Sequence, residues 1–553
     1  MFDARALLVS LHRAAVEGAE PFGRTREAVS RWLMLNQSTL APGATFRIFG
    51  MGKASVAMSA GAVAALHDAG LDPQHGVVVS AVPANSPRTD AGNDGQSIGH
   101  ASANSNANSD ADARPAPKHH LPLSFTVVSG DHPVPGPASL HAADLISDTV
   151  ADVQPNDVAL VLLSGGTSSL AAAPVSALAL AVGDVERAQA HLANLADTLL
   201  ESGLAIHEMN AIRRRLLRWG AGRLAVALYE QGAARIPVFA ISDVIGDDPA
   251  VIGSGPCSPD PLDEPAFLAL LDAHNVRNAL ERDTALFLGL AGSGRPPIVA
   301  PATHAAFARV DYEIVARNRD AVLALSAAAR IADVDHVFVD DAPLEGDAAP
   351  LGDRIARYAI TQARTLPAPE SAIFVFGGEP VVNLRATYER AWDDEDDTSV
   401  DEPAANVESG LDLRRRAVDD LRETFGDFLP ELLSPAQRAR LDEPMRGGRM
   451  QVLALSAAFA LEEAAAAGDA AAWRITILAA GTDGRDGPTD AAGAIVDAAT
   501  PALARRGGRR PEQDLATGRS WFPLDAAQAL LRSGPTGTNV MDVVAVYVAR
   551  ARQ

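Results

Sequence analysis

Short apolar runs that break into loops rich in glycine, aspartate and hydroxyl residues recur along this chain. The clearest is residues 475–480, which read as a buried strand and lead into a loop, residues 481–493, that carries carboxylates, glycines and threonines. Residues 157–164 and 236–241 repeat the pattern. Open α/β sheets place ligands outside the carboxyl ends of their strands. The pattern therefore predicts an α/β fold whose functional groups lie in strand-end loops.

Length and charge limit the function classes. A chain of 553 residues is too long for one hydrophobic core, so two or three domains are expected. A net charge of −23 argues against nucleic acid or an anionic membrane as the main partner, but not against an anionic substrate. The single Cys257 excludes an intramolecular disulfide framework. With no long apolar run and no secretory signal pattern, a soluble cytoplasmic protein without a membrane span is expected.

Two segments interrupt the α/β pattern. Residues 83–120 are dominated by Asn, Ser, Asp, Ala and Gly, and are expected to form a disordered surface insertion. Residues 391–444 contain an acidic run and are expected to form a second insertion. The domain limit is placed at 295/296, which gives an N-terminal domain of residues 1–295 and a C-terminal domain of residues 296–553.

The first candidate ligand loop follows an apolar run at residues 46–49. Gly50, Gly52 and Lys53 then precede an alanine-rich helix, so the backbone can approach an anion at a helix N-terminus. The spacing is not that of a P-loop, and Ser55 stands where a dinucleotide fingerprint has its third glycine. A lysine that merely faces solvent at a helix start is the alternative.

The second candidate loop is Ser164, Gly165, Gly166, Thr167 and Ser168, between a buried strand and a helix. Its backbone N–H groups and the helix dipole suit an anion. The alternative is an ordinary hydroxyl N-cap, which requires only one of these side chains.

Further candidates are polar side chains on a helix and at strand ends. Asn210 and Arg213 are spaced i, i+3 on one helix face and would suit a carboxylate or phosphate, although helix arginines are usually solvated. Asp243 and Asp483 follow apolar runs and offer oxygen ligands for a hard cation, with a solvated turn as the alternative. His132, which precedes a proline, is either a substrate contact or a residue held there for turn geometry.

Taken in order, these loops resemble the glycerate kinases that phosphorylate the 2-hydroxyl of D-glycerate, a family often labelled hydroxypyruvate reductase. The matching segments cover nearly the whole chain outside the two insertions: 50–54, 131–135, 164–166, 210–214, 242–247, 253–256, 377–379, 447–449, 481–487 and 534–540. Each segment is weak alone, but the ordered set is specific. The chain departs from the family pattern at Thr167 and Ser169, and at Met450 and Val452, where the family has an amide and a carboxylate.

The resemblance implies two α/β domains, an N-terminal Rossmann-like domain and a C-terminal MOFRL-type domain, with the active site in the cleft between them. It implies ATP-dependent phosphorylation of D-glycerate to 2-phospho-D-glycerate, with ATP and Mg²⁺ as cofactors. It leaves a homodimer open.

The resemblance also suggests residue roles. Lys53 would contact the transferring phosphate, and Arg449 a phosphate or the glycerate carboxylate. Asn210 and Arg213 would orient glycerate beside the 164–168 loop, while Asp243 and Asp483 would hold Mg²⁺ or accept the hydroxyl proton. Expected nucleotide contacts are Gly50, Gly52, Gly481, Thr482, Gly534, Thr536, Thr538 and Asn539.

Two other functions remain open from the sequence. An NAD(P)H-dependent hydroxypyruvate reductase would be expected to carry the third glycine that this chain lacks. A non-catalytic nucleotide-binding homologue is suggested by Met450 and Val452, which replace polar residues near the expected site.

Overall fold

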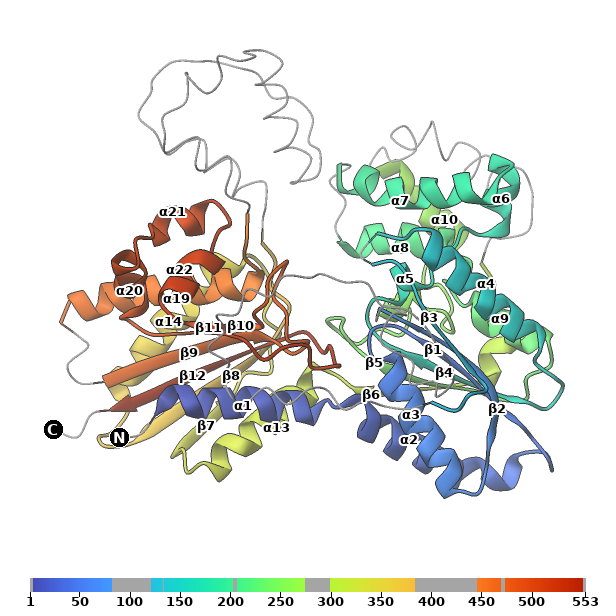
Figure 1. Cartoon of the computed structure of the whole chain (residues 1–553), viewed down its shortest axis with the longest axis horizontal. Helices are drawn as coiled ribbons and strands as arrows, with labels where there is room; N and C mark the ends of the chain where they lie inside the picture. Colours follow the sequence, from blue (N-terminus) through green and yellow to red (C-terminus); the bar gives the residue numbers. More distant parts are fainter. Residues whose placement is uncertain are drawn as a thin grey trace, which may run out of the picture.

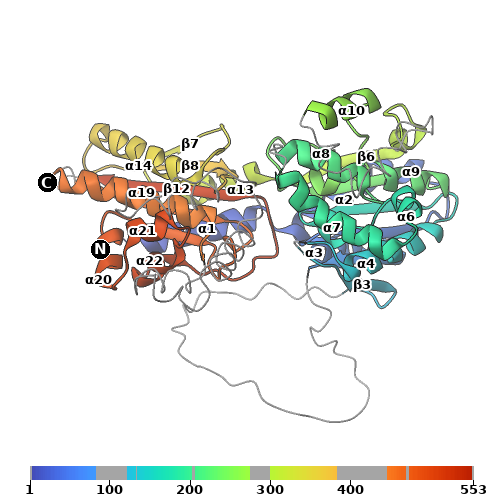
Figure 2. The ribbon, with the colours of Figure 1, turned by 90° about the horizontal axis from the view of Figure 1, so that it is seen from above.

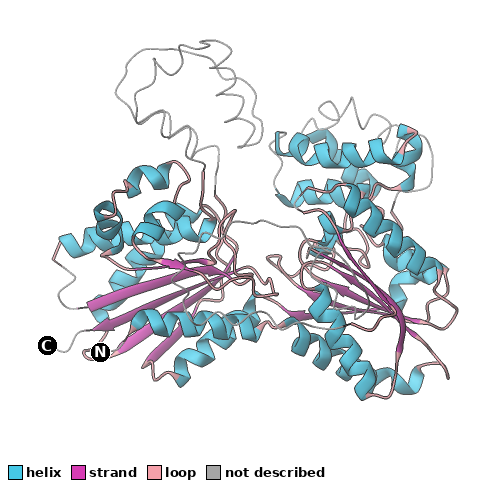
Figure 3. Cartoon of the chain, viewed as in Figure 1, coloured by secondary structure: helices cyan, strands magenta, loops and turns pink. Residues whose placement is uncertain are grey.

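The computed structural model describes residues 3–81, 121–132, 134–201, 206–273, 299–382, 445–468 and 473–550. Both predicted insertions, 83–120 and 391–444, lie outside these residues. The predicted domain limit at 295/296 also lies outside them. The described residues form two six-stranded sheets, each covered by helices (Figures 1 and 3).

The first sheet is parallel throughout and has the strand order β3-β2-β1-β4-β5-β6. Its strands are β1 (Phe46–Met51), β2 (Pro73–Ser80), β3 (Phe125–Ser129), β4 (Val158–Leu163), β5 (Ile236–Ile241) and β6 (Val310–Ala316). Every residue of β4 and β5 is buried, as expected where helices cover both faces of a parallel sheet. Because β6 pairs with β5, the first sheet extends beyond the limit at 295/296 that the sequence suggested.

Helices cover both faces of the first sheet. One face carries α2 (Pro21–Asn36) and α3 (Ser55–Asp68), and the other carries α4 (Pro137–Ala151) and α9 (Arg223–Glu230). Four further helices share a separate apolar cluster (Figure 1). These are α6 (Ser176–Val182), α7 (Val185–Glu201), α8 (Ile206–Leu216) and α10 (Glu264–Ala273).

The second sheet is mixed and has the order β11-β10-β9-β12-β8-β7, with only β7 and β8 parallel. Its strands are β7 (His336–Val339), β8 (Ser371–Gly378), β9 (Trp473–Gly481), β10 (Gly493–Val496), β11 (Leu530–Leu531) and β12 (Asp542–Arg550). One face is covered by α14 (Ala348–Thr365) and α19 (Arg449–Ala466). The short helices α20 (Thr500–Arg506), α21 (Pro511–Ala516) and α22 (Trp521–Ala526) lie near α19.

The other face of the second sheet is covered by α1 (Ala4–Gly18) and α13 (Asn318–Ile331), as Figures 1 and 2 show. The two helices approach so closely that a Cβ on Gly18 would lie 2.3 Å from the Cβ of Ala324. The first helix of the chain therefore belongs with the second sheet. This differs from the expectation that residues 1–295 form one N-terminal domain.

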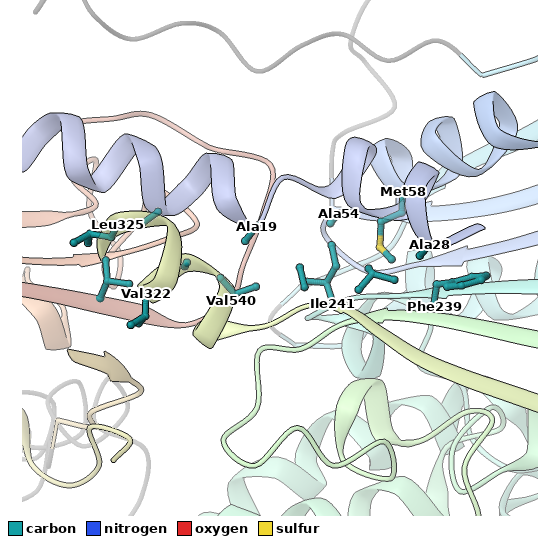
Figure 4. Packing of buried hydrophobic residues seen from close by; sticks show 14 of the residues in the cluster. Ala19, Ala28, Ala54, Met58, Phe239, Ile241, Val322, Leu325 and Val540 are labelled. Atoms are coloured by element: carbon teal, nitrogen blue, oxygen red, sulfur yellow. The ribbon is translucent and has the colours of Figure 1, made fainter. Parts of the chain in front are cut away.

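The two halves share one hydrophobic cluster (Figure 4). Val322 and Val540 of the second half and Ile241 and Met58 of the first belong to it, and Ala19 lies between α1 and α2. The two sheets are therefore joined by packed hydrophobic residues where the chain passes from one half to the other. Across the described ranges, no helix combines the length and apolar character that crossing a membrane requires.

Candidate active site

Two of the predicted loops interlock at one edge of the first sheet. Because β1, β4 and β5 are parallel, the loops at their carboxyl ends lie side by side. The backbone N–H of Lys53 donates to the carbonyl of Gly165 at 2.9 Å. The N–H of Ala54 donates to Ser164 Oγ at 3.0 Å. The β1 loop and the β4 loop therefore form a single surface.

Close packing accounts for two glycines of the first loop. Gly52 has φ of +118°, and a Cβ there would lie 2.3 Å from Ser164 Oγ. Gly50 lies inside β1, where a Cβ would meet Ser59 Oγ at 2.6 Å. These contacts explain both glycines without a ligand, and their nucleotide-binding role stays a prediction.

Charged groups surround the turn formed by Gly165 and Gly166. A Cβ on Gly165 would lie 1.9 Å from Asp243 Oδ2, so only glycine leaves room for that carboxylate. A Cβ on Gly166 would lie 3.3 Å from Lys53 Cγ and 3.4 Å from His132 Cδ2. Lys53 is exposed, and its ammonium group forms no hydrogen bond or ion pair with the described residues. The turn thus has the carboxylate of Asp243 beside Gly165, and the side chains of Lys53 and His132 beside Gly166.

Burial and neighbouring charges shift the pKa values at this turn. Burial, with the charge of Glu379, raises the pKa of Asp243 to about 6, although Lys53 and Arg449 oppose the rise. Burial and the nearby Lys53 lower the pKa of His132. At neutral pH, Asp243 is therefore mainly ionised, although its pKa lies close to that pH, while His132 is neutral.

The hydroxyl groups of the second loop divide into two kinds. Ser164 and Thr167 are buried, and Thr167 Oγ1 lies 3.0 Å from Met51 O and 2.7 Å from Ser164 O. These two side chains join the β1 and β4 loops. Ser168 is half-buried and forms no side-chain hydrogen bond within the described residues. Of the three predicted hydroxyls, Ser168 is the one with a free side chain.

Asn210 and Arg213 lie on α8, which contacts η2 (Ile252–Ser254). A Cβ on Gly253 of η2 would lie 3.0 Å from Thr167 Cβ. The short helix η2 therefore contacts both α8 and the second loop. Burial lowers the pKa of Arg213, and no described carboxylate pairs with it.

The neighbours of Arg213 on the same helix behave differently. Arg214 and Arg215 both pair with Asp260, at 3.0 Å and 2.7 Å. A partly buried guanidinium without a counter-charge is unfavourable unless an anion joins it. The two adjacent arginines therefore have structural ion pairs, whereas Arg213 has no carboxylate partner among the described residues and its anion-binding role stays a prediction.

Arg449, the first residue of α19, lies at the edge of the second sheet. Its Nε and Nη2 donate to the two carboxylate oxygens of Asp542, at 2.6 Å and 3.3 Å. Its Nη1 pairs with Glu379 Oε1 at 3.1 Å. Asp542 begins β12 opposite both Gly378 and Gly481, the last residues of β8 and β9. The predicted catalytic arginine thus begins a helix beside the ends of β8 and β9, where both Asp542 and Glu379 pair with its guanidinium.

Asp486, in the 481–493 loop, is a third carboxylate near Arg449 and binds the start of α19. Asp486 accepts the backbone N–H groups of Met450 at 3.1 Å and Gln451 at 2.7 Å, at the start of α19. A Cβ on Gly448 would meet Asp486 Oδ1 at 2.2 Å. Burial raises the pKa of Asp486 to about 7. Asp486 therefore caps the helix that carries Arg449.

The two departures from the family pattern on α19 are core residues. Met450 and Val452 are buried in the cluster between α19 and the second sheet. Their apolar character is therefore explained by packing.

The predicted nucleotide-binding threonines hold loops together. Thr482 Oγ1 donates to Met541 O at 2.7 Å, and Thr536 Oγ1 donates to Thr482 O at 2.6 Å. Thr538 Oγ1 donates to Ala19 O at 2.7 Å. Gly534 adopts φ of +70°, which glycine tolerates best. Whether these residues also contact a nucleotide remains a prediction.

Asn539 joins the two halves at the site. Its Nδ2 lies 3.4 Å from Asp243 Oδ2, and its Oδ1 accepts the N–H of Met541 at 3.2 Å. The 534–539 loop thus reaches the carboxylate beside the Gly165–Gly166 turn. Asp243 is the point at which groups from both sheets meet.

The predicted pair of metal-binding carboxylates is not assembled by shared contacts. Asp483 Oδ1 accepts the N–H of Arg485 at 2.9 Å, and its charge acts on His12 and Asp486. No group of three or more His, Cys, Asp or Glu side chains that would hold a metal occurs among the described residues. Mg²⁺ is usually held by one or two carboxylates together with substrate phosphates. The carboxylates present fit an ion that arrives with a nucleotide.

The fold and the site define a two-sheet α/β protein with a glycine turn that lies beside a buried carboxylate and an exposed lysine. Residues 7–288 match the model of a domain of unknown function, DUF4147, and residues 437–542 match the MOFRL family. A glycerate kinase of Macaca fascicularis is 30% identical over 430 residues, which are 75% of this chain and 95% of that protein. The chain belongs to the glycerate kinase family that carries a MOFRL domain.

Other relatives carry two different names. A D-glycerate 2-kinase of Thermotoga maritima is 27% identical over 421 residues, 76% of this chain and 79% of that protein. A protein of Agrobacterium vitis named as a hydroxypyruvate reductase is 28% identical over 549 residues, 99% of this chain and 95% of that protein. The crystal structure of a Thermotoga maritima glycerate kinase shares the fold, with a TM-score of 0.63, 23% identity and 99% coverage of both chains.

Sequence reasoning did not assign Glu379 or Asp542 to the site, and it gave His132 as either a substrate contact or a turn residue. Glu379 and Asp542 hold Arg449, and His132 lies beside Lys53. Glu379 and His132 belong to segments that matched the family, but their partners are distant in sequence. Asp542 lies two residues beyond the last matched segment, and its role depends on β12 lying between β8 and β9.

Proposed function

We propose that this protein phosphorylates the 2-hydroxyl of D-glycerate with ATP and Mg²⁺, giving 2-phospho-D-glycerate and ADP. The observation that carries the proposal is the Gly165–Gly166 turn, with an unpaired Lys53 on one side and Asp243 on the other. Phosphoryl transfer depends mainly on positioning and charge neutralisation, which these groups supply. The relatives named glycerate kinase support the same reaction.

In this proposal, Lys53 neutralises charge on the phosphoryl group during transfer. Its ammonium group is exposed and unpaired among the described residues, so it meets an incoming anion without first breaking an ion pair. Preorganised charge of this kind stabilises a transition state more than a group that must reorganise. The neighbouring N–H groups of the Gly165–Gly166 turn would help to hold the same anion.

Asp243 acts as the proton acceptor for the 2-hydroxyl. A general base works best when its pKa lies near the working pH, and burial raises the pKa of Asp243 to about 6. As the hydroxyl proton passes to Asp243, the oxygen at C2 forms a bond to the γ-phosphorus, and the bond from that phosphorus to the bridging oxygen of ADP breaks. Asn539 would keep the carboxylate oriented, since its amide lies 3.4 Å away.

Arg213 and Asn210 bind the glycerate carboxylate in this scheme. Arg213 is partly buried and unpaired among the described residues, while its neighbours Arg214 and Arg215 share Asp260. A carboxylate would supply the counter-charge that Arg213 otherwise lacks. Mg²⁺ would neutralise the nucleotide phosphates, and Asp483 is the partly exposed carboxylate available to hold it.

The proposal is tested by incubating purified protein with D-glycerate, ATP and Mg²⁺ and identifying the product by NMR. A parallel reaction contains hydroxypyruvate with NADH or NADPH. Formation of 2-phosphoglycerate supports the proposed reaction and its position of attack. Consumption of NAD(P)H without phosphorylation would instead support the reductase name that the Agrobacterium vitis relative carries.

A further inference from the structure

Arg449 has two acidic partners with different surroundings. Asp542 binds its Nε and Nη2 through both carboxylate oxygens, and only 3% of the Asp542 side chain is exposed. Glu379 makes one contact, to Nη1 at 3.1 Å, and 37% of its side chain is exposed. A buried two-point contact is held far more firmly than a single contact at an exposed carboxylate.

The position of Asp542 is fixed by the sheet. It begins β12 between the ends of β8 and β9, and its carbonyl accepts a hydrogen bond from Asn318 Nδ2 at 2.9 Å. Burial raises the pKa of Asp542 to about 7, while the positive charge of Arg449 opposes that rise. Asp542 is thus a rigid anchor on one edge of the guanidinium.

Glu379 acts through its charge on Asp243, which belongs to the first half of the molecule. Its charge is the main electrostatic influence raising the pKa of Asp243, on which Lys53 and Arg449 also act. Asn539, three residues before Asp542, has its Nδ2 3.4 Å from Asp243 Oδ2, so the segment that supplies Asp542 also reaches the carboxylate beside the Gly165–Gly166 turn. A bound anion in that region would compete with Glu379 for Nη1.

We propose that Glu379 is a displaceable placeholder on Arg449, and that Asp542 is the positioning residue that holds the guanidinium when Glu379 leaves. The incoming group is an oxyanion, either a phosphate of the nucleotide or the carboxylate of the acid substrate. The inference rests on the proposed function for the identity of these ligands. Its consequence is that the two carboxylates have opposite effects on binding, because removing Glu379 exposes the guanidinium and removing Asp542 releases it.

The test compares Glu379→Gln with the wild type by isothermal titration calorimetry, using ADP in the presence of EDTA in one series and D-glycerate in another. Loss of an exposed competing carboxylate is expected to tighten binding of one ligand up to about fivefold. The ligand that gains affinity identifies the oxyanion at Arg449. Glu370→Gln is the matched control, because Glu370 is 38% exposed and pairs with His336 at the end of β8 opposite to Glu379.

Two further variants show whether the effect passes through Arg449. In an Arg449→Met background, Glu379→Gln is expected to leave the affinity unchanged, which is the result of a double-mutant cycle for directly coupled residues. Asp542→Asn is expected to weaken binding of the same ligand and to lower kcat. Thermal unfolding of each variant identifies any that fail to fold, in which case the Glu379→Gln series carries the test.

Unchanged or weaker binding of both ligands by Glu379→Gln would overturn the placeholder role. If Glu379→Gln tightened ligand binding equally in the Arg449→Met background, the proposal that Glu379 acts through Arg449 would be overturned. If the wild type does not phosphorylate glycerate but Glu379→Gln still binds ADP more tightly, the proposed function fails and the placeholder role stands.

Discussion

The cations of the first half of the site are free, whereas the cation of the second half is paired. Lys53 and Arg213 form no ion pair with the described residues. Arg449 is held by Asp542 and Glu379. In the first half, a ligand can therefore pair with Lys53 or Arg213 without displacing a carboxylate. In the second half, a ligand must compete with Glu379 or Asp542 for Arg449.

The two surroundings also differ in what they contribute to the fold. Lys53 is exposed, so its side chain adds little to stability. Arg449 neutralises the buried Asp542, and the helix that it begins is capped by Asp486. Activity and stability should therefore separate for Lys53 and fall together for Arg449.

The largest expected effect is that of Lys53→Met on catalysis. Removal of a cation that stabilises the transferring phosphoryl group should lower kcat by roughly 10³-fold. The melting temperature should stay that of the wild type, because the ammonium group has no partner among the described residues. Steady-state kinetics and differential scanning calorimetry measure the two quantities. A variant that retains wild-type kcat would remove Lys53 from the reaction.

Arg449→Met should lower both activity and stability. Loss of a charge-assisted hydrogen bond to buried Asp542 is expected to cost about 1.5–3 kcal/mol. Urea unfolding measures the change, with Arg357→Met as a control, since Arg357 pairs with Asp353 and Glu463 on the surface. Wild-type stability in Arg449→Met would contradict the contrast between the two halves.

The activity should also depend on pH through Asp243. With a pKa of about 6, this carboxylate loses its capacity to accept a proton on acidification, so kcat/KM at pH 5 should be about tenfold below its value at pH 8. Because folding raises this pKa from 3.8, the contribution of Asp243 to stability decreases as pH rises from about 4 to about 6. Asp243→Asn should lack the acidic limb in any residual rate and should be more stable than the wild type at pH 8.

The smallest expected effect is a change in the titration of His132. Lys53 contributes to the lowered pKa of His132, so Lys53→Met should raise that pKa while burial still keeps it below the ordinary value. NMR of the imidazole signals against pH measures the shift. An unchanged pKa would indicate that the two side chains do not interact across Gly166.

The local sequence predicted the first half of the site better than the second. Lys53, the Ser164–Ser168 loop and Asp243 each follow a buried strand, and parallel strands bring such loops together at one edge. In the second half, the neighbours of Arg449 depend on antiparallel pairing of β12 with strands that are far away in sequence. No local pattern indicates that Asp542 rather than a ligand meets the guanidinium.

Some residues predicted to bind ligands proved to have structural contacts that the sequence could not distinguish. Thr482 and Thr538 look like loop hydroxyls, but both bond to backbone carbonyls. The position of α1 was also unpredictable, since amphipathic spacing shows that a helix packs on a sheet without showing which sheet.

The most direct test of the account is a crystal structure with D-glycerate, Mg²⁺ and a non-hydrolysable ATP analogue. The account predicts a γ-phosphoryl oxygen within hydrogen-bond distance, about 3 Å, of Lys53 Nζ, and the glycerate 2-hydroxyl at the same distance from Asp243. A nucleotide bound away from the Gly165–Gly166 turn, or the 3-hydroxyl in place of the 2-hydroxyl at Asp243, would contradict it.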